Sequence, residues 1–213
     1  RLSWDNGLSP EEIAGEWVRQ SFCLTAEEED RVTALLCTSR EVYEDYTCPL
    51  AVGFMCRPKI HYGVDVDGYE YDRWGTYHYA DRDGVGRDRT VMTGTAYTRQ
   101  YSDPRFEEYD DLSTCPDELL LFFHHVPYTH VLQSGKTVIQ HIYDTHFRGV
   151  EKVLEYQALW DSLKDSLDEE SYFNVKERLA WQYENAVNWR DQVNTYFYRK
   201  SGIPDEKGRR IYQ

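Results

Sequence analysis

Three short stretches of the sequence carry residue types that bind metal ions or phosphates in other proteins. "DVDG", residues 65–68, has the carboxylate spacing of a calcium loop, but the alignment puts Gly63 and Trp74 where oxygen ligands are required. "SGKT", residues 134–137, matches the end of a phosphate-binding loop, yet His130 stands where the first glycine belongs. "GVGRDR", residues 84–89, lacks the third glycine of a dinucleotide fingerprint and a surrounding βαβ unit. We therefore predict an aspartate-braced turn at 65–68 and a helix start at 135–137.

The seven histidines raise the possibility of a metal site. His141 and His146 are five residues apart, which separates them on a helix surface. His124, His125 and His130 cluster in "HHVPYTH", but no cysteine or carboxylate stands beside them at ligand spacing. We predict buried, hydrogen-bonded histidines, with no metal and no cofactor.

Carboxylates and aromatic rings are the remaining chemical groups. The 38 acidic residues offer no pair that the sequence can nominate for acid/base work, so no catalytic residue is predicted. The 18 tyrosines and 6 tryptophans supply flat apolar faces with a polar edge, which suit sugar rings and wet interfaces. Trp74, Tyr77 and Tyr79 lie in a glycine-punctuated segment, where they either bind a ligand or pack the loop onto helices. Spacing alone favours packing.

Charge and hydropathy exclude several classes of partner. The formal net charge of −14 disfavours nucleic acid and anionic membranes, which both require positive surface. No apolar run approaches the roughly 20 residues of a membrane-spanning helix. The chain begins with Arg1 and shows no signal peptide, so we expect a processed product or a segment of a longer protein.

The five cysteines are odd in number and form no CxxC pair; they stand at positions 23, 37, 48, 56 and 115. A disulfide-built secreted domain is usually smaller and has an even, denser set. We predict reduced, mostly buried thiols and a cytosolic protein.

The elements that must position these groups are mainly helices. Capping boxes at Ser9 and Thr25 predict helices after residues 9 and 25, and Pro49 limits the second one. A buried helix is predicted to start at Thr114 or Cys115, with Pro116 inside its first turn. Apolar stripes predict two long helices, one over 135–163 and one over 168–200, joined near residue 167.

The middle of the chain, from about residue 49 to 112, shows no sustained period. It is too rich in Tyr, Trp, Val and Ile to be disordered. A long ordered irregular segment is usually functional. The fold class predicted is therefore mainly α, one helical domain over residues 1–213 with a long antiparallel hairpin and an irregular middle.

Four long stretches together resemble a known family. They are "RLSWDNGLSPEEIAGEWVRQSF", "HYGVDVDGYEYDRWGTYHYADRDGVGRDRT", "TCPDELLLFFHHVPYTHVLQSGKTVIQHIYDTHFRGVE" and "NWRDQVNTYFYRKSGIPDEKGR". The sequence resembles the C-terminal domain of family 67 glycoside hydrolases, the xylan α-1,2-glucuronidases, over essentially its whole length.

The resemblance implies an inverting enzyme that removes 4-O-methylglucuronic or glucuronic acid from xylo-oligosaccharides. Its acid, base and uronate-holding residues would come from a (β/α)₈ barrel, which this sequence does not contain. The domain would add homodimer contacts and an aromatic wall at the rim of the active site. Trp74 matches the family position of that wall, so we expect it to face substrate. No role is carried onto Tyr77 or His78.

The implied partners are glucuronoxylan oligosaccharides, the enzyme's own barrel and a second copy of the chain. Trp181 and Trp189 stand off the main apolar stripe of their helix, which indicates a dimer contact or a surface against the barrel. The alternatives are a stand-alone helical interaction module and an autonomous carbohydrate-binding domain, although the latter is commonly a β-sandwich. Family members are found both inside cells and secreted, and the thiols favour the cytosol.

Overall fold

A computed structural model describes residues 3, 5–53, 55–68 and 79–211. The chain is mainly helical, as predicted, and its described residues contain three isolated β-bridges but no strand. In chain order the elements are α1 (Pro10–Ser21), α2 (Ala26–Thr47), η1 (Pro49–Ala51), η2 (Tyr97–Gln100), α3 (Arg105–Asp110), α4 (Asp117–Phe123), α5 (Val138–Ser162) and α6 (Glu169–Ser201). None of these helices is both long and apolar enough to cross a membrane.

The predicted helix ends are confirmed where the sequence carries a cap. Ser9 Oγ accepts from the Glu12 N–H at 3.1 Å, and the Ser9 N–H donates to Glu12 Oε2 at 2.7 Å. Thr25 and Glu28 form the same reciprocal pair at the start of α2. Asp168 caps α6, and Gly202 ends it in the left-handed conformation. Each such cap stabilises its helix by about 1 kcal/mol.

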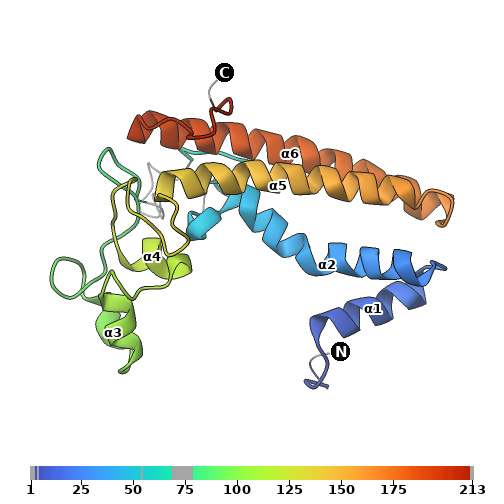
Figure 1. Ribbon diagram of the computed structural model, residues 1–213, viewed down its shortest axis with the longest axis horizontal. Coiled ribbons are helices and arrows are strands. Elements are labelled where there is room, and N and C mark those ends of the chain that lie inside the picture. Colours follow the sequence, from blue (N-terminus) through green and yellow to red (C-terminus); the bar gives the residue numbers. More distant parts are fainter. Residues whose placement is uncertain (1–2, 4, 54, 69–78, 212–213) are drawn as a thin grey trace.

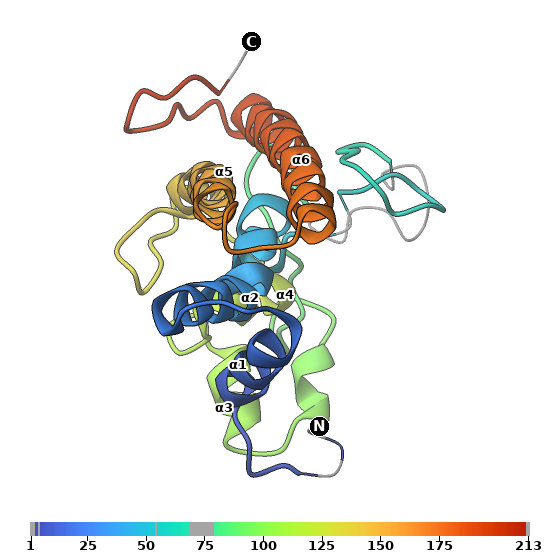
Figure 2. The same ribbon diagram turned by 90° about the vertical axis from the view of Figure 1, so that its right-hand side faces the viewer.

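The long hairpin forms the body of the molecule. Helices α5 and α6 run antiparallel side by side, α2 packs on α5, and α1 packs on α2 (Figures 1 and 2). Trp160 Nε1 donates to the Tyr172 carbonyl at 3.0 Å, which ties the two long helices together near their turn. The core side chains of α5 include Ile142, Val153 and Trp160, all buried on the predicted stripe.

A buried ionic cluster fastens the C-terminal tail to α5. Arg209 Nη2 donates to Asp144 at 2.6 Å and to Asp205 at 2.8 Å, and both carboxylates are buried. Gln140 Nε2 also donates to both of them. These bonds hold residues 203–211 against the start of α5, and the tail runs beside α6 on the side of α5 (Figure 2).

The structure corrects three sequence predictions. Helix α4 begins at Asp117, not at Thr114 or Cys115, because Pro116 takes the extended cap position (ψ 142°) outside the first turn. The short helix α3 interrupts the segment predicted to be irregular. Of the five cysteines, all free, Cys115 alone is buried, so the thiols are mostly not buried.

The structure also corrects the prediction that Trp189 lies on an additional apolar surface of α6. Trp189 is 8 % exposed and belongs to the core, whereas Trp181 is 54 % exposed. Beyond Trp189, residues of α6 border both the loop at Val66 and Ile211 of the C-terminal tail, so this half of the helix has neighbours in addition to α5.

Candidate functional site

The irregular segment is held in place by backbone contacts to the α4–α5 connection. The Val85 N–H donates to the Val126 carbonyl at 3.0 Å, and the Val126 N–H returns a bond of 2.9 Å. The Arg89 N–H donates to the Phe123 carbonyl at 2.8 Å. A Cβ on Gly84 would stand 2.2 Å from the Val126 carbonyl oxygen, so only glycine permits this close approach.

The same segment shapes a cavity that we call the loop pocket. Its volume is about 740 Å³, which falls within the range of small-molecule sites. It is lined by Tyr79, Ala80, Asp81, Gly86, Arg87, Asp88, Thr93, Gly94, Thr95 and His125. Most of these side chains are polar, so the pocket suits a ligand with many hydrogen-bonding groups.

Tyr79 and Arg87 form a stacked pair in the loop pocket. The Arg87 guanidinium carbon lies 4.4 Å from the centroid of the Tyr79 ring. Tyr79 has a φ of 41°, a left-handed conformation that costs a bulky residue about 1–2 kcal/mol. Strain of this kind persists where surrounding contacts impose it, and it is often found at binding sites.

Asp81 and His125 are neighbours in the lining of the loop pocket. His125 Nε2 lies 3.5 Å from an Asp81 oxygen, while His125 Nδ1 donates to the Gly86 carbonyl at 2.8 Å. Burial acts to raise the pKa of Asp81, but hydrogen bonds from the Asp83 and Gly84 N–H groups and the charges of His125 and Lys200 lower it overall. Asp81 is therefore an ionised acceptor at neutral pH.

Asp88 is saturated by hydrogen bonds from its own loop. Its Oδ1 accepts from the Thr90 N–H and hydroxyl at 3.0 and 2.7 Å, and its Oδ2 accepts from the Thr93 hydroxyl at 2.6 Å. Burial acts to raise the pKa of Asp88, and these hydrogen bonds outweigh it and lower the pKa. A glycosidase acid needs a raised pKa, so neither Asp81 nor Asp88 suits that role.

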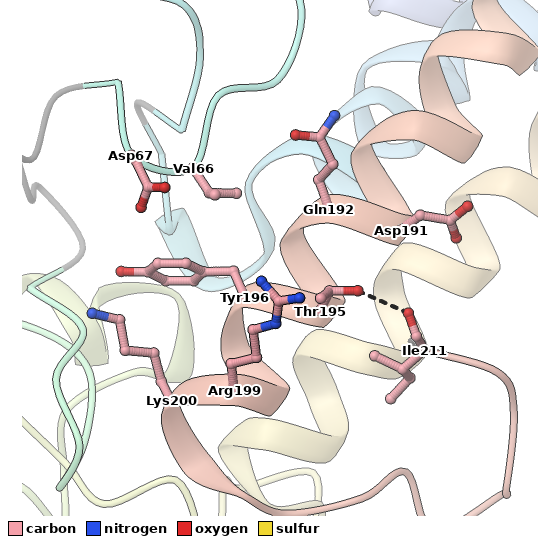
Figure 3. Close-up of a pocket in the computed structure, with 9 residues that line it drawn as sticks. All are labelled: Val66, Asp67, Asp191, Gln192, Thr195, Tyr196, Arg199, Lys200 and Ile211. Atoms are coloured by element: carbon pink, nitrogen blue, oxygen red, sulfur yellow. Dashed lines mark hydrogen bonds between the residues drawn. The ribbon is translucent and has the colours of Figure 1, made fainter. Parts of the chain in front are cut away.

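A second cavity, which we call the α6 groove, lies between α6 and the loop that carries Val66 and Asp67. Its volume is about 610 Å³, and it is lined by Val66, Asp67, Asp191, Gln192, Thr195, Tyr196, Arg199, Lys200 and Ile211 (Figure 3). Tyr196 and Lys200 extend from α6 in one direction, towards the loop that carries Asp67. The charge of Lys200, which lines the α6 groove, also contributes to lowering the pKa of Asp81 in the loop pocket.

The predictions for the rejected motifs can be compared with this geometry. The Asp67 N–H donates to Asp65 Oδ1 at 3.2 Å, which confirms the braced turn. Thr137 caps α5, which confirms a helix start at "SGKT". His124 and His146 are buried and bonded to carbonyl oxygens, as predicted. The described residues contain no group of three or more potential metal ligands.

Comparison with known sequences places this chain in a family. The profile described as "Glycosyl hydrolase family 67 C-terminus" matches residues 1–210. The chain is 40 % identical over 210 residues to "Alpha-glucuronidase A" of Emericella nidulans, and 39 % identical to "Probable alpha-glucuronidase A" of Aspergillus clavatus. Each match covers 98 % of this chain and 25 % of the relative, so the chain spans about a quarter of these proteins.

The chain belongs to glycosyl hydrolase family 67. It corresponds to the C-terminal part of that family, which confirms the resemblance found in the sequence. Trp74, the substrate-facing residue expected from the resemblance, lies outside the described residues, and so does Tyr77. Tyr79, for which packing was favoured, lines the loop pocket of this family 67 chain.

Sequence reasoning missed Arg87, Asp81 and His125. His125 was treated with its neighbours as a core histidine, although its side chain is 31 % exposed and lies 39 residues from the carbonyl that it contacts. The glycines at 84, 86 and 94 were a usable signal for this part of the family 67 chain, because they mark the close backbone approaches that create the pocket.

Proposed function

We propose that this chain is the C-terminal domain of an inverting xylan α-1,2-glucuronidase. The enzyme would remove 4-O-methylglucuronic or glucuronic acid from xylo-oligosaccharides, and this domain would supply dimer contacts and an aromatic wall. The observation that supports the proposal most directly is the 40 % identity to the Emericella nidulans α-glucuronidase over nearly the whole chain. The domain would act with a catalytic barrel elsewhere in the enzyme.

The chemistry of the loop pocket supports a binding role without hydrolysis. Inversion requires a carboxylic acid with a raised pKa and a carboxylate base on opposite sides of the sugar. Asp81 and Asp88 both have lowered pKa values. We expect the 213-residue chain alone to release no uronic acid from 4-O-methylglucuronosyl-xylotriose above a buffer control. Turnover that survives rigorous purification would contradict this role.

The aromatic wall is proposed for Trp74. An indole against the sugar would exclude water and strengthen the polar contacts made by the barrel. Such a contact would stabilise the bound sugar by about 1–2 kcal/mol. Trp74→Ala in the full-length enzyme is then expected to lower kcat/KM about ten-fold with little change in Tm. If Trp74 packs in the core instead, the variant loses about 3–5 kcal/mol of stability and keeps near-normal kinetics.

The dimer contact is proposed around Trp181. Its ring is 54 % exposed, and the adjacent Asn185 amide donates to the hydroxyl of Tyr62, which is 67 % exposed. Light scattering of the full-length enzyme is expected to give a dimer, and Trp181→Glu a monomer. A wild-type monomer at micromolar concentration would contradict the dimer. If Trp181→Glu remains a dimer but has a lowered Tm, Trp181 packs within its own subunit and does not form the dimer contact.

A further inference from the structure

We propose that Asn6 is a site of spontaneous deamidation, at which the backbone nitrogen of Gly7 converts the asparagine into aspartate and isoaspartate. The chain contains five asparagines, and Asn6 is the one that a glycine follows. This covalent modification needs only the chain and water, so it does not depend on the proposed function.

The reaction proceeds through a ring formed by two neighbouring residues. The Gly7 nitrogen attacks the side-chain carbonyl carbon of Asn6, and a new N–C bond closes a succinimide. The C–N bond of the side-chain amide breaks, and ammonia leaves with the proton that the Gly7 nitrogen gives up. Water then opens the ring at either carbonyl, which yields aspartate or isoaspartate. No group is oxidised or reduced in either step.

The surroundings of Asn6 and Gly7 leave room for ring closure. Both residues are exposed in a turn that precedes Ser9, the cap of α1. Among the described residues, the atom that a Cβ on Gly7 would meet within 4 Å is Asp5 Oδ1, at 3.4 Å. The attack requires the backbone between residues 6 and 7 to rotate. Glycine allows this rotation more readily than any other residue, and open space around it removes a steric barrier.

The other four asparagines are held in the opposite situation. All of them lie inside α6, which spans Glu169–Ser201. In an α-helix the N–H that follows each asparagine bonds to the carbonyl four residues back, and the backbone cannot rotate towards the side chain. Each is also followed by a residue with a side chain. These four asparagines, which serve as internal comparisons, are Asn174, Asn185, Asn188 and Asn194.

Asp5 is expected to slow the reaction at its neighbour. The Gly7 N–H donates to Asp5 Oδ1 at 3.2 Å. The Gly7 nitrogen must lose this proton before it attacks, and a carboxylate beside it both holds the proton and disfavours a negative nitrogen. Asp5→Ala, which removes the acceptor and its charge, is therefore expected to deamidate about three-fold faster, as fits the loss of an exposed polar interaction.

The test follows residue 6 in the full-length enzyme during storage at mildly alkaline pH. Cleavage after Arg1 and Arg19 releases residues 2–19, a peptide in which Asn6 carries the one side-chain amide. Exchange of the NH₂ group for OH raises the mass of this peptide. Two products of the same raised mass are expected on chromatography, because the succinimide opens at either carbonyl. The asparagines of α6 are expected to react at least ten-fold more slowly, because attack there first requires the helix to open.

Two variants check the ring-closure step. Asn6→Gln keeps an amide but would have to close a larger ring, so its peptide is expected to gain no mass while the wild type reacts. Gly7→Ala is expected to slow the wild-type reaction about five-fold, because alanine samples fewer backbone conformations. A single product at residue 6, or a rate no higher than in α6, would overturn the proposal. Reaction in urea-unfolded but not in folded enzyme would also overturn it, because the folded enzyme would then close the site.

Discussion

The α5–α6 hairpin and the irregular segment from residue 49 to 96 are stabilised by different means. The hairpin uses repeated apolar positions and capped ends, and its described left-handed residue is the terminal Gly202. The described part of the irregular segment contains six non-glycine residues with positive φ, at positions 50, 51, 59, 61, 79 and 96. Such residues are costly one by one, so tertiary contacts must hold them in place.

The two regions also differ in how their polar groups are hydrogen-bonded. The irregular segment satisfies its carboxylates by short-range hydrogen bonds, as at Asp81 and Asp88. The hairpin instead buries polar groups deep between helices. His146 Nε2 and both polar atoms of the Asn194 amide lack hydrogen-bond partners there. Among the described residues, the buried side-chain atoms without a hydrogen-bond partner therefore lie in the hairpin, whereas the positive-φ residues other than glycine lie in the irregular segment.

The largest effect is expected where the ionic cluster closes the hairpin. Arg209→Met removes the guanidinium, which lies 4.2 Å from the centroid of the Phe147 ring, and leaves the buried Asp205 carboxylate without its main cation. Breaking a buried pair in this way costs about 3–5 kcal/mol. Chemical denaturation of the chain measures the loss. The control, Arg40→Met, removes an exposed pair with Glu44 and should change stability by less than about 0.5 kcal/mol. If the two variants lose the same free energy of unfolding, the ionic cluster stabilises the fold no more than an exposed ion pair does.

The folding stability of the chain should depend on pH through the buried His146 in α5. Burial lowers the pKa of His146 from 6.5 to about 4, against the opposing hydrogen bond to the Ile142 carbonyl. The unfolded chain therefore binds the proton first, so stability is complete above pH 6.5 and falls as the pH drops towards 4. At 1.36 kcal/mol per pKa unit, the loss reaches about 3 kcal/mol near pH 4.

Denaturation between pH 8 and pH 4 measures this slope, and His146→Phe should flatten most of it. Residual slope is expected from His141, whose pKa is also lowered, by burial first and by the charges of Lys136 and Arg148.

Asp205 affects stability in a lower pH range than His146. Burial opposes its ionisation, but bonds from Arg209 and Gln140 lower its pKa to about 2, so its contribution disappears only as the pH falls from 3.8 towards 2. An unchanged slope in His146→Phe would contradict the assignment.

A smaller effect is expected in the irregular segment, at Gly84. A Cβ there meets the Val126 backbone carbonyl, which cannot rotate away, so Gly84→Ala should cost about 1–3 kcal/mol. The matched control is Gly53→Ala in the same region, where the nearest atom to a Cβ would be 3.8 Å away. The control should be neutral or slightly stabilising. Melting curves of the two variants separate close packing from flexibility as the reason for the glycine.

The smallest effect, and the one of opposite sign, is expected at Asn194. Its amide is fully buried on α6 without a hydrogen-bond partner. Replacing it by an apolar residue of similar size removes the cost of burying those polar atoms. Asn194→Leu should stabilise the chain by about 1 kcal/mol, whereas Asn188→Leu on the exposed face of α6 should not. Destabilisation by Asn194→Leu would show that the amide has a partner in solution, such as a buried water.

The hairpin was predictable because its information is local. Asp168 and Gly202 mark the ends of α6 within the residues that form it, and the apolar stripe repeats every turn. The boundary of α4 was less predictable, since Pro116 can stand either at the cap or in the first turn. Neither choice conflicts with the sequence pattern, so packing decided it.

The sequence by itself determined the long helices α1, α2, α5 and α6, their caps and membership of family 67, because each depends on residues near one another in the chain or on long motifs. Only the tertiary structure decided the loop pocket. Arg87 meets Tyr79 eight residues earlier through a strained turn, and His125 comes from 38 residues beyond Arg87. It also decided that Trp189 is core and Trp181 is surface. The physical reason is that burial and close approach depend on which other segment covers a residue, and no local pattern records that neighbour.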